Sequence, residues 1–289
     1  MTQYFVKRHL NQSFDHGLIP QLLYICNVGD THTRLPRTMH MHDDVIEIIF
    51  IKEGNGTHII DGRKYRIMKG DILIYNNGVL HDEYAESEAD MSVFCCGITN
   101  VKVPGLPRNH LVSGEHSCVL HSGEHRSDIE SLLEMMYLQI SEEKPGAEEI
   151  CSYLLCALIA IILQIPKENA ALSKSEESEL TNVIKAYIDE HYSEDITLQL
   201  LSQKFHISSY YLVHAFKKST GFSPIQYIIR RRIGEAQSLL INTNDSVTKI
   251  AGTVGYDNMS YFTTLFSKIV GISPKKYRQH WTKNKSSKN

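Results

Sequence analysis

The sequence predicts an α+β protein with two domains, an N-terminal domain of short strands followed by helices and a C-terminal domain made only of helices. Three observations support this fold class. Residues 38–98 alternate short apolar runs with turn sequences, and from residue 128 onward the apolar residues follow a helical period. The last third of the chain carries an internal repeat. The 289 residues are enough to build two hydrophobic cores.

Charge divides the chain at the same place. Residues 178–289 contain 15 Lys and Arg against 8 Asp and Glu, a net charge of +7, whereas residues 1–177 contain 15 and 25, a net charge of −10. The basic C-terminal part suggests a polyanionic partner, with an incidental solvated surface as the alternative.

Composition also bears on the compartment. The N-terminal sequence MTQYFVKRHLNQSF lacks the apolar run of a signal peptide. The most apolar segment, residues 150–165, is short for a bilayer span, so we expect a buried helix rather than a membrane helix. The six cysteines show no metal-ligand spacing and are expected to be reduced thiols. We therefore expect a cytoplasmic protein without a membrane partner.

The N-terminal domain is expected to start with an arm and a first strand within residues 1–36. Several short β-branched runs then follow, separated by Gly- and Asn-rich turns such as Gly54-Asn55-Gly56 and Asp61-Gly62. Strand spacing of this kind predicts a sandwich or barrel. The expected strands are residues 22–28, 45–51, 57–60, 65–68, 71–75 and 91–97. Residues 99–126 are rich in Gly, Pro and His and are expected to be irregular.

Two helices are expected next, at residues 128–142 and 147–165, separated by Lys144-Pro145-Gly146 and ended by Pro166. The apolar face of the second helix is wider than one neighbouring helix covers. A homodimer contact is the preferred explanation, and packing against the barrel is the other. Residues 167–178 are small and polar and are expected to form a linker.

The C-terminal domain begins with a helix around residues 180–188. Thr197 and Ser208 are expected to cap the next two helices, and Gly221 to end the second of them. Ser223-Pro224 starts a long helix that runs to about residue 241.

An internal repeat covers most of this domain. Phe216, Gly221, Pro224 and Tyr227 recur 50 residues later, and three apolar residues from residue 201 onward recur 49 residues later. A duplicated helix-turn-helix follows, at residues 197–219 and 246–269. Ser202 and Ala251 fall where the two helices of each unit cross, and close approach there requires a small residue.

The outward face of each second helix is the expected base-reading surface, because a recognition helix lies in the major groove. The expected base-reading residues are Ser209, Tyr210, Val213, His214, Met259, Ser260, Thr263 and Thr264. Basic residues nearby are expected to contact phosphates, which position the protein without specifying sequence. These are Lys217, Lys218, Arg230, Arg231, Arg232, Lys268, Lys275 and Lys276. A protein-interaction module is the alternative to a DNA-binding domain.

The C-terminal third resembles the DNA-binding domain of the AraC family of transcriptional regulators. The resemblance rests on FKKSTGFSPIQYIIRRRIGEAQSLL and IAGTVGYDNMSYFTTLFSKIVGISPKKYR and covers residues 178–280. It implies a regulator whose two motifs enter successive major-groove segments of a double-stranded DNA operator. Members of the family often carry Arg at the positions of His214 and Thr264 and Lys at Ser267. These departures suggest fewer contacts to guanine and a greater dependence on phosphates. We expect Tyr210, Val213 and His214 to carry more of the sequence specificity than the second motif.

Four polar residues in the strand region form a second constellation: His40, His42, Glu47 and His81. Three imidazoles and a carboxylate are a plausible ligand set for Zn, Fe, Mn or Ni. The surrounding spacing resembles both cupin motifs, although the leading glycine of the first is absent and Asn76 and Ala85 depart from the second. This resemblance implies a double-stranded β-helix barrel over residues 35–98. Because AraC-type sensor domains resemble cupins without a known ion, these residues are expected to line an effector pocket, with a divalent metal as the alternative.

These expectations define the organisation of the chain. An effector-sensing, cupin-like domain spans residues 1–126, a helical dimerisation segment 127–166, the linker 167–178, the DNA-binding domain 179–282 and a polar tail 283–289. The expected function is a sequence-specific DNA-binding regulator controlled by a small-molecule effector, a sugar or related metabolite, acting as a homodimer and contacting RNA polymerase if it activates.

No catalytic residue and no cofactor are expected. A metal-dependent cupin enzyme is one alternative, although it leaves the duplicated DNA-binding domain unexplained. A metal or redox sensor that uses the histidines or Cys95-Cys96 is another, although adjacent cysteines are usually buried strand residues.

Overall fold

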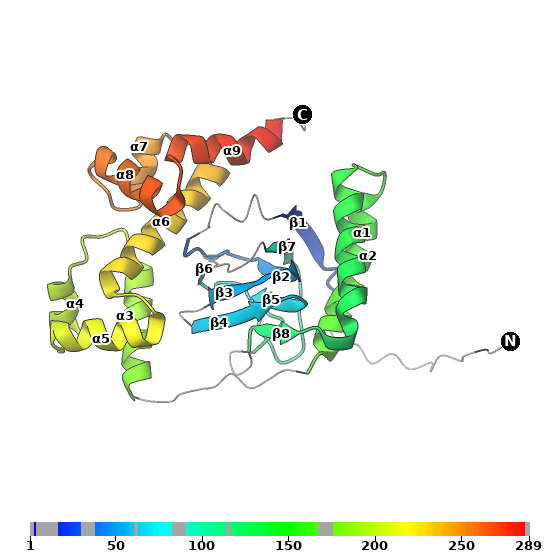
Figure 1. The fold of residues 1–289 in the computed structure, drawn as a ribbon, viewed down its shortest axis with the longest axis horizontal. Coiled ribbons are helices and arrows are strands. Elements are labelled where there is room, and N and C mark those ends of the chain that lie inside the picture. The colour runs from blue at the N-terminus through cyan, green and yellow to red at the C-terminus, as the bar shows by residue number, and fades with distance from the viewer. Residues whose placement is uncertain are drawn as a thin grey trace.

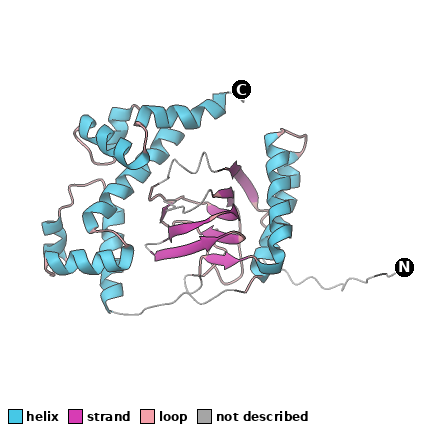
Figure 2. Cartoon of the chain, viewed as in Figure 1, coloured by secondary structure: helices cyan, strands magenta, loops and turns pink. Residues whose placement is uncertain are grey.

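A β-rich domain lies between a helical hairpin and a larger group of helices (Figure 1 and Figure 2). The computed structural model describes residues 3, 17–29, 38–60, 63–82, 91–113, 117–166 and 176–286. The hairpin of α1 (Arg126–Ser141) and α2 (Ala147–Gln164) covers one side of the strands. The C-terminal helices lie on the other side. The α+β class and the two-domain architecture are therefore as predicted.

Among the described residues, the strands form two antiparallel sheets. The five-stranded sheet has the order β1-β7-β2-β5-β8, and the three-stranded sheet has the order β4-β3-β6. The strands of the first are β1 (Gln21–Val28), β7 (Ser92–Thr99), β2 (Ile46–Glu53), β5 (Asp71–Tyr75) and β8 (Val119–His121). Those of the second are β4 (Arg63–Met68), β3 (Asn55–Ile60) and β6 (His81–Asp82).

The central strand β2 is buried on both faces, which explains its unbroken apolar sequence. Ile46, Ile48 and Phe50 belong to the core shared with α1 and α2. Ile49 and Ile51 point the other way, into the core between the two sheets. Glu47 alternates onto that same inner side, because successive strand residues face opposite directions. A carboxylate is thereby placed inside the barrel.

The outer face of the helical hairpin is less covered. The inner side of α2 packs against the five-stranded sheet through Leu155, Ile159 and Ile162, which supports the barrel-packing explanation for part of its apolar face. The remaining apolar side chains reach solvent. Met135, Leu138, Ile150 and Tyr153 are exposed.

Within residues 176–286, the C-terminal domain forms seven helices. They are α3 (Glu176–His191), α4 (Leu198–Lys204), α5 (Ser209–Thr220), α6 (Pro224–Asn242), α7 (Val247–Thr253), α8 (Met259–Val270) and α9 (Pro274–Ser286). Thr197 and Ser208 accept hydrogen bonds from the backbone as N-caps of α4 and α5, and Gly221 ends α5 in the left-handed conformation, as predicted. Helices α3 to α6 enclose one core and α6 to α9 a second, so α6 is shared by both helix-turn-helix units.

Some local expectations were wrong. The short strand β8 and the 3-10 turn at Gly123–His125 lie in a segment expected to be irregular. Asn55 and Gly56 already belong to β3, so the expected turn is confined to Gly54. Helix α9 continues into the expected polar tail, and the end of the expected linker belongs to α3. The rest of that linker and the Asp61-Gly62 turn lie outside the described residues.

Candidate functional site

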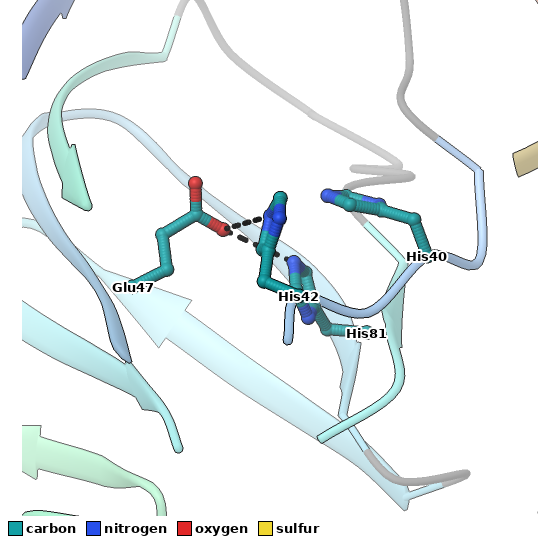
Figure 3. Close-up of side chains that lie close together, drawn as sticks. All are labelled: His40, His42, Glu47 and His81. Atoms are coloured by element: carbon teal, nitrogen blue, oxygen red, sulfur yellow. Dashed lines mark ion pairs between the residues drawn. The ribbon is translucent and has the colours of Figure 1, made fainter. Parts of the chain in front are cut away.

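His40, His42, Glu47 and His81 come together at one end of the barrel, as expected (Figure 3). One ligand atom from each lies within 4.8 Å of those of the other three. The Nε2 atoms of His81 and His42 lie 3.0 and 3.8 Å from Oε2 of Glu47. Three members of this tetrad are buried and His42 is half-buried. The arrangement can hold a divalent metal ion or bind a polar ligand.

Backbone carbonyls fix the orientation of two of the imidazoles. Nδ1 of His40 lies 3.0 Å from the carbonyl oxygen of Thr38, and Nδ1 of His81 lies 3.0 Å from that of Val79. Since a carbonyl oxygen only accepts, each Nδ1 must carry the proton and donate it. Nε2 of each ring then faces the centre of the tetrad, where it can bind a metal ion through its lone pair or, when it carries a proton, donate to Glu47. This is the outer-shell arrangement commonly found around metal-binding histidines.

Glu47 is held by two residues that the sequence reasoning missed. The Tyr24 hydroxyl donates to Oε1 at 2.7 Å, and the Cys95 thiol donates to the same oxygen at 3.0 Å. Oε2 is thereby turned toward the histidines. Glu47 and Tyr24 both pair with Gly97 on β7, one from each side. Their strand pairing could have suggested the contact, but only after the register was known.

A second layer of aromatic groups lies behind His81. The ring of Tyr75 stacks on His81 with centroids 4.0 Å apart, and the Tyr75 hydroxyl lies 3.0 Å from Nδ1 of His58. Burial, followed by repulsion from His81, lowers the pKa of His58 to about 4. His58 is therefore neutral at physiological pH, so it adds polarity to the barrel interior without charge.

The helix α5 presents its predicted face to solvent. Tyr210 and His214 are exposed and their rings lie 4.3 Å apart, with Val213 half-buried beside them. Ser209 is half-buried, and its hydroxyl bonds that of Ser202 at 2.8 Å where α4 and α5 cross. Ser209 is thus partly committed to holding the helix pair together.

The equivalent face of α8 is less available for base contacts. Ser260 and Thr264 are exposed, but the Thr264 hydroxyl donates to the Ser260 carbonyl at 2.9 Å. Thr263 is half-buried, and Met259 packs against the second helical core.

Five of the expected phosphate contacts are exposed lysines. They are Lys217, Lys218, Lys268, Lys275 and Lys276. Arg230 is half-buried and lies over the ring of Phe222.

The two other arginines serve the fold, which corrects the expectation for Arg231. Arg231 is 2% exposed, pairs with Glu235 at 3.1 Å and lies over the ring of Tyr192. Phosphates cannot reach a guanidinium in that position. Arg232 donates to the carbonyls of Tyr192, Glu194 and Gly255, and so ties α6 to the segment between α3 and α4 and to the turn between α7 and α8.

Two family descriptions match consecutive parts of the chain. "Helix-turn-helix domain" matches residues 201–280, and "AraC-like ligand binding domain" matches residues 25–159. The uncharacterized HTH-type transcriptional regulator YdiP of Escherichia coli is 31% identical over 246 residues, which cover 84% of this chain and 81% of YdiP. The chain belongs to the AraC family of transcriptional regulators.

Other relatives also align over most of the chain. The MmsAB operon regulatory protein of Pseudomonas aeruginosa is 29% identical over 89% of this chain and 83% of its own length. The HTH-type transcriptional activator RhaS of Escherichia fergusonii is 27% identical, over 82% of this chain and 86% of its own length. The chain is accordingly a DNA-binding transcription regulator with an N-terminal ligand-binding domain, and not an enzyme.

Solved structures resemble the chain in part or along most of its length. The DNA-binding domain of AdpA, solved with a target DNA, is 26% identical with a TM-score of 0.36, over 37% of this chain and 96% of that domain. ToxT of Vibrio cholerae is 13% identical with a TM-score of 0.44, over 93% of this chain and 98% of its own.

The offset of 50 pairs Tyr211 with Tyr261, and both side chains are exposed at the start of a recognition helix, where a phenol hydroxyl can donate to phosphate. The repeat itself could have revealed this pair.

Among the described residues, α2 is long and apolar enough to cross a bilayer, but buried core helices meet the same criterion.

Proposed function

We propose that this AraC-family regulator is a cytoplasmic transcription activator whose operator affinity is set by an effector bound in the barrel. The observation that supports it is the tetrad, a cluster of polar side chains that converge inside the barrel (Figure 3). Helices α5 and α8 are the proposed major-groove elements, and the exposed lysines are the proposed phosphate contacts. Activation would require a contact with RNA polymerase.

Selection of bound sequences from a random DNA pool tests this function. We expect one enriched sequence with two half-motifs, and an enrichment that changes when the selection is repeated with a panel of sugars and related metabolites. A pool that stays random would contradict sequence-specific binding. An enriched sequence whose recovery no ligand changes would contradict control by an effector.

A divalent metal ion is the second candidate for the effector. The observation that favours it over a sugar is the alignment of the His40 and His81 rings by backbone carbonyls, which turns Nε2 of each toward Glu47. The tetrad contains one carboxylate, that of Glu47. A metal ion bound by these residues would bring positive charge next to this carboxylate inside the barrel.

Metal content of purified protein distinguishes the two effector classes. We expect one equivalent of bound metal for the metal-sensing candidate, lost in His42→Ala and retained in the control His110→Ala, which alters a histidine outside the tetrad. Wild-type protein that takes up no Zn²⁺, Mn²⁺ or Ni²⁺ on dialysis would leave the sugar or metabolite candidate.

The outer face of the hairpin is the proposed homodimer contact. It exposes Met135, Leu138, Ile150 and Tyr153, and desolvating such a face stabilises association by about 25 cal/mol per Å². Sedimentation of the wild type is expected to show a dimer, and Ile150→Lys with Tyr153→Lys a monomer. A dimer that survives both changes would place the contact elsewhere.

A further inference from the structure

The barrel contributes two side chains to the hydrophobic core of the DNA-binding domain. Met39 and Leu80 are 2% and 6% exposed, and they share a core with Ile184, Ile188, Phe216 and Tyr227 of the C-terminal helices. These two residues are separated from the helices by about 100 residues or more of sequence. The two domains therefore make a specific apolar contact.

Helix α6 receives the backbone of the same segment. Thr38 donates to Oε1 of Gln237 through its amide nitrogen at 2.9 Å and through its hydroxyl at 2.7 Å. Gly234 lies one turn away, and a Cβ at that position would come 1.9 Å from the carbonyl oxygen of Met39. Only a glycine permits this approach without a shift of the backbone.

The segments that dock on the helices also carry the tetrad. Each docking side chain precedes a tetrad histidine, Met39 before His40 and Leu80 before His81. His40 and His81 bond to each other through both backbone amides, at 3.0 Å each, as an antiparallel bridge. Successive residues in such a bridge face opposite sides. The histidines therefore face the barrel interior while Met39 and Leu80 face the DNA-binding domain.

A hydrogen-bonded path joins the two sides of this bridge. The Thr38 carbonyl orients His40, while the Thr38 amide and hydroxyl bond to Gln237 on α6. A single layer of chain thus separates the tetrad from the helix that both helix-turn-helix units share.

We propose that the His40–His81 bridge is a latch that couples ligand binding at the tetrad to docking of the DNA-binding domain on the barrel. The proposal rests on the proposed effector site and names how that site reaches the DNA-binding domain. In the docked form, Met39 and Leu80 contact the C-terminal helices, and the Thr38 carbonyl aligns His40. A ligand of the tetrad therefore binds the docked form more tightly than an undocked form that lacks these contacts. By thermodynamic reciprocity, ligand binding strengthens docking by the same factor.

The test uses Zn²⁺ as the probe, full-length protein and a matched pair of glycines. Gly234→Ala places a methyl group against Met39 and favours the undocked form. Gly252→Ala, on α7, adds the same methyl group where nothing lies within 4 Å. Because alanine is a better helix former than glycine, neither change weakens its own helix. Gln237→Leu removes the acceptor for Thr38 at similar volume and provides an independent disruption.

Two readouts are needed, Zn²⁺ affinity by competition with a chelator and amide exchange at His40 and His81. We expect Gly234→Ala and Gln237→Leu to lower Zn²⁺ affinity about tenfold, within the range typical of coupled sites, and to speed exchange at the bridge. Gly252→Ala should match the wild type in both. Zn²⁺ should shift operator affinity of the wild type and of Gly252→Ala but not of Gly234→Ala.

Three results would overturn the latch. They are faster bridge exchange in Gly234→Ala with unchanged Zn²⁺ affinity, unchanged exchange in both disruptive variants, and a wild type that binds no Zn²⁺. In each case operator binding by the wild type would stand, so the proposed DNA-binding function would survive. Failure of the wild type to bind any selected operator would instead contradict the proposed function.

Discussion

At the scale of single residues, the position of Glu47 depends on the absence of a side chain at Gly97. The ring of Tyr24 crosses β7 directly over this glycine, and a Cβ there would lie 2.2 Å from the ring. This close approach lets the Tyr24 hydroxyl reach Glu47 on the next strand. One glycine therefore sets the direction in which the only tetrad carboxylate points.

Replacing this glycine should affect both stability and the tetrad. Gly97→Ala is expected to lower the free energy of unfolding by about 1–3 kcal/mol, because an inserted methyl group must displace the ring. It should also weaken Zn²⁺ binding about tenfold through the reoriented carboxylate. Urea unfolding and chelator competition measure the two effects. Tyr24→Phe is the control, because it keeps the ring and removes only the hydroxyl. If Gly97→Ala leaves the free energy of unfolding unchanged, the predicted overlap between a Cβ at residue 97 and the Tyr24 ring is contradicted.

His58 should make metal-free protein less stable in acid. Its folded pKa of about 4 lies below the ordinary 6.5, so between these values the unfolded chain binds a proton that the folded chain does not. Stability therefore falls as pH drops from 6.5 toward 4, by about 3 kcal/mol in total from this group. Urea unfolding at several pH values, compared between wild type and His58→Gln in chelator, isolates the contribution. Parallel stability curves for the two proteins would refute it.

The prediction that Arg231 contacts phosphates was wrong, because this side chain is buried. The run of three arginines was interpreted as a basic surface, yet the helical period places Arg231 four residues after buried Tyr227 and three before Gly234. That spacing was the available signal for an inward-facing residue. His40, His42, Glu47 and His81 were predictable as a group from spacing that resembles the cupin motifs, although His42 lies outside the strands and His40 only in an isolated bridge. Tyr24 and Cys95 required the register of β1, β2 and β7.

At the scale of elements, the two recognition helices are not equivalent. Tyr210 is 76% exposed and lies beside His214, whereas on α8 the Thr264 hydroxyl is bonded within its own helix. The first helix thus offers more groups that can reach base edges. That the first motif carries more of the sequence specificity stays a prediction.

Alanine substitutions should separate the two helices. Tyr210→Ala and His214→Ala are each expected to reduce the difference in binding free energy between operator and non-specific DNA by about 1–3 kcal/mol, because they remove candidate base contacts. Ser260→Ala and Thr264→Ala should change it less. Fluorescence anisotropy against operator and scrambled duplexes measures the ratio. A larger loss from the α8 variants would reverse the assignment.

Helices were easier to predict than short strands. Caps at Thr197 and Ser208 and the stop at Gly221 set helix ends within a residue or two, because each cap satisfies a local backbone group. Strand β8 is three residues long, and pairing with β5, distant in sequence, stabilises it. No local pattern in residues 99–126 distinguishes it from loop.

At the scale of the whole molecule, the charge asymmetry predicts a steep salt dependence of DNA binding. The exposed lysines of the C-terminal domain are the groups that would release counterions from DNA, while buried Arg231 would release none. Net charge was visible in the sequence, but which cations face solvent was not.

Removing two of these lysines should flatten the salt dependence. The change Lys275→Ala with Lys276→Ala is expected to reduce the slope of log affinity against log salt by roughly 1.8. Arg231→Met should leave the slope unchanged and lower the melting temperature instead, because it leaves Glu235 without its partner. DNA-affinity titrations at four salt concentrations measure the slope for each variant, and thermal unfolding of the same proteins measures the melting temperature. A slope that changes with Arg231→Met would show that this arginine reaches DNA.

The contact between the domains could not be predicted from the sequence. Met39 and Leu80 look like ordinary core residues of the barrel, and neither periodicity nor composition indicates that they belong to the core of another domain. Gly234 and Gln237 are equally uninformative within a helical pattern. Long-range contacts of this kind depend on how two finished domains fit, which local sequence does not encode.

The bridge between His40 and His81 also limits how this protein can diverge. A substitution at either histidine alters the ligand chemistry and leaves the outward side chains in place. Insertion or deletion of one residue beside the bridge would exchange the two faces, because strand side chains alternate. Point mutations at the histidines can therefore change the chemistry of the proposed site alone, whereas changes in length within residues 38–42 would disturb both the tetrad and the contact with the DNA-binding domain.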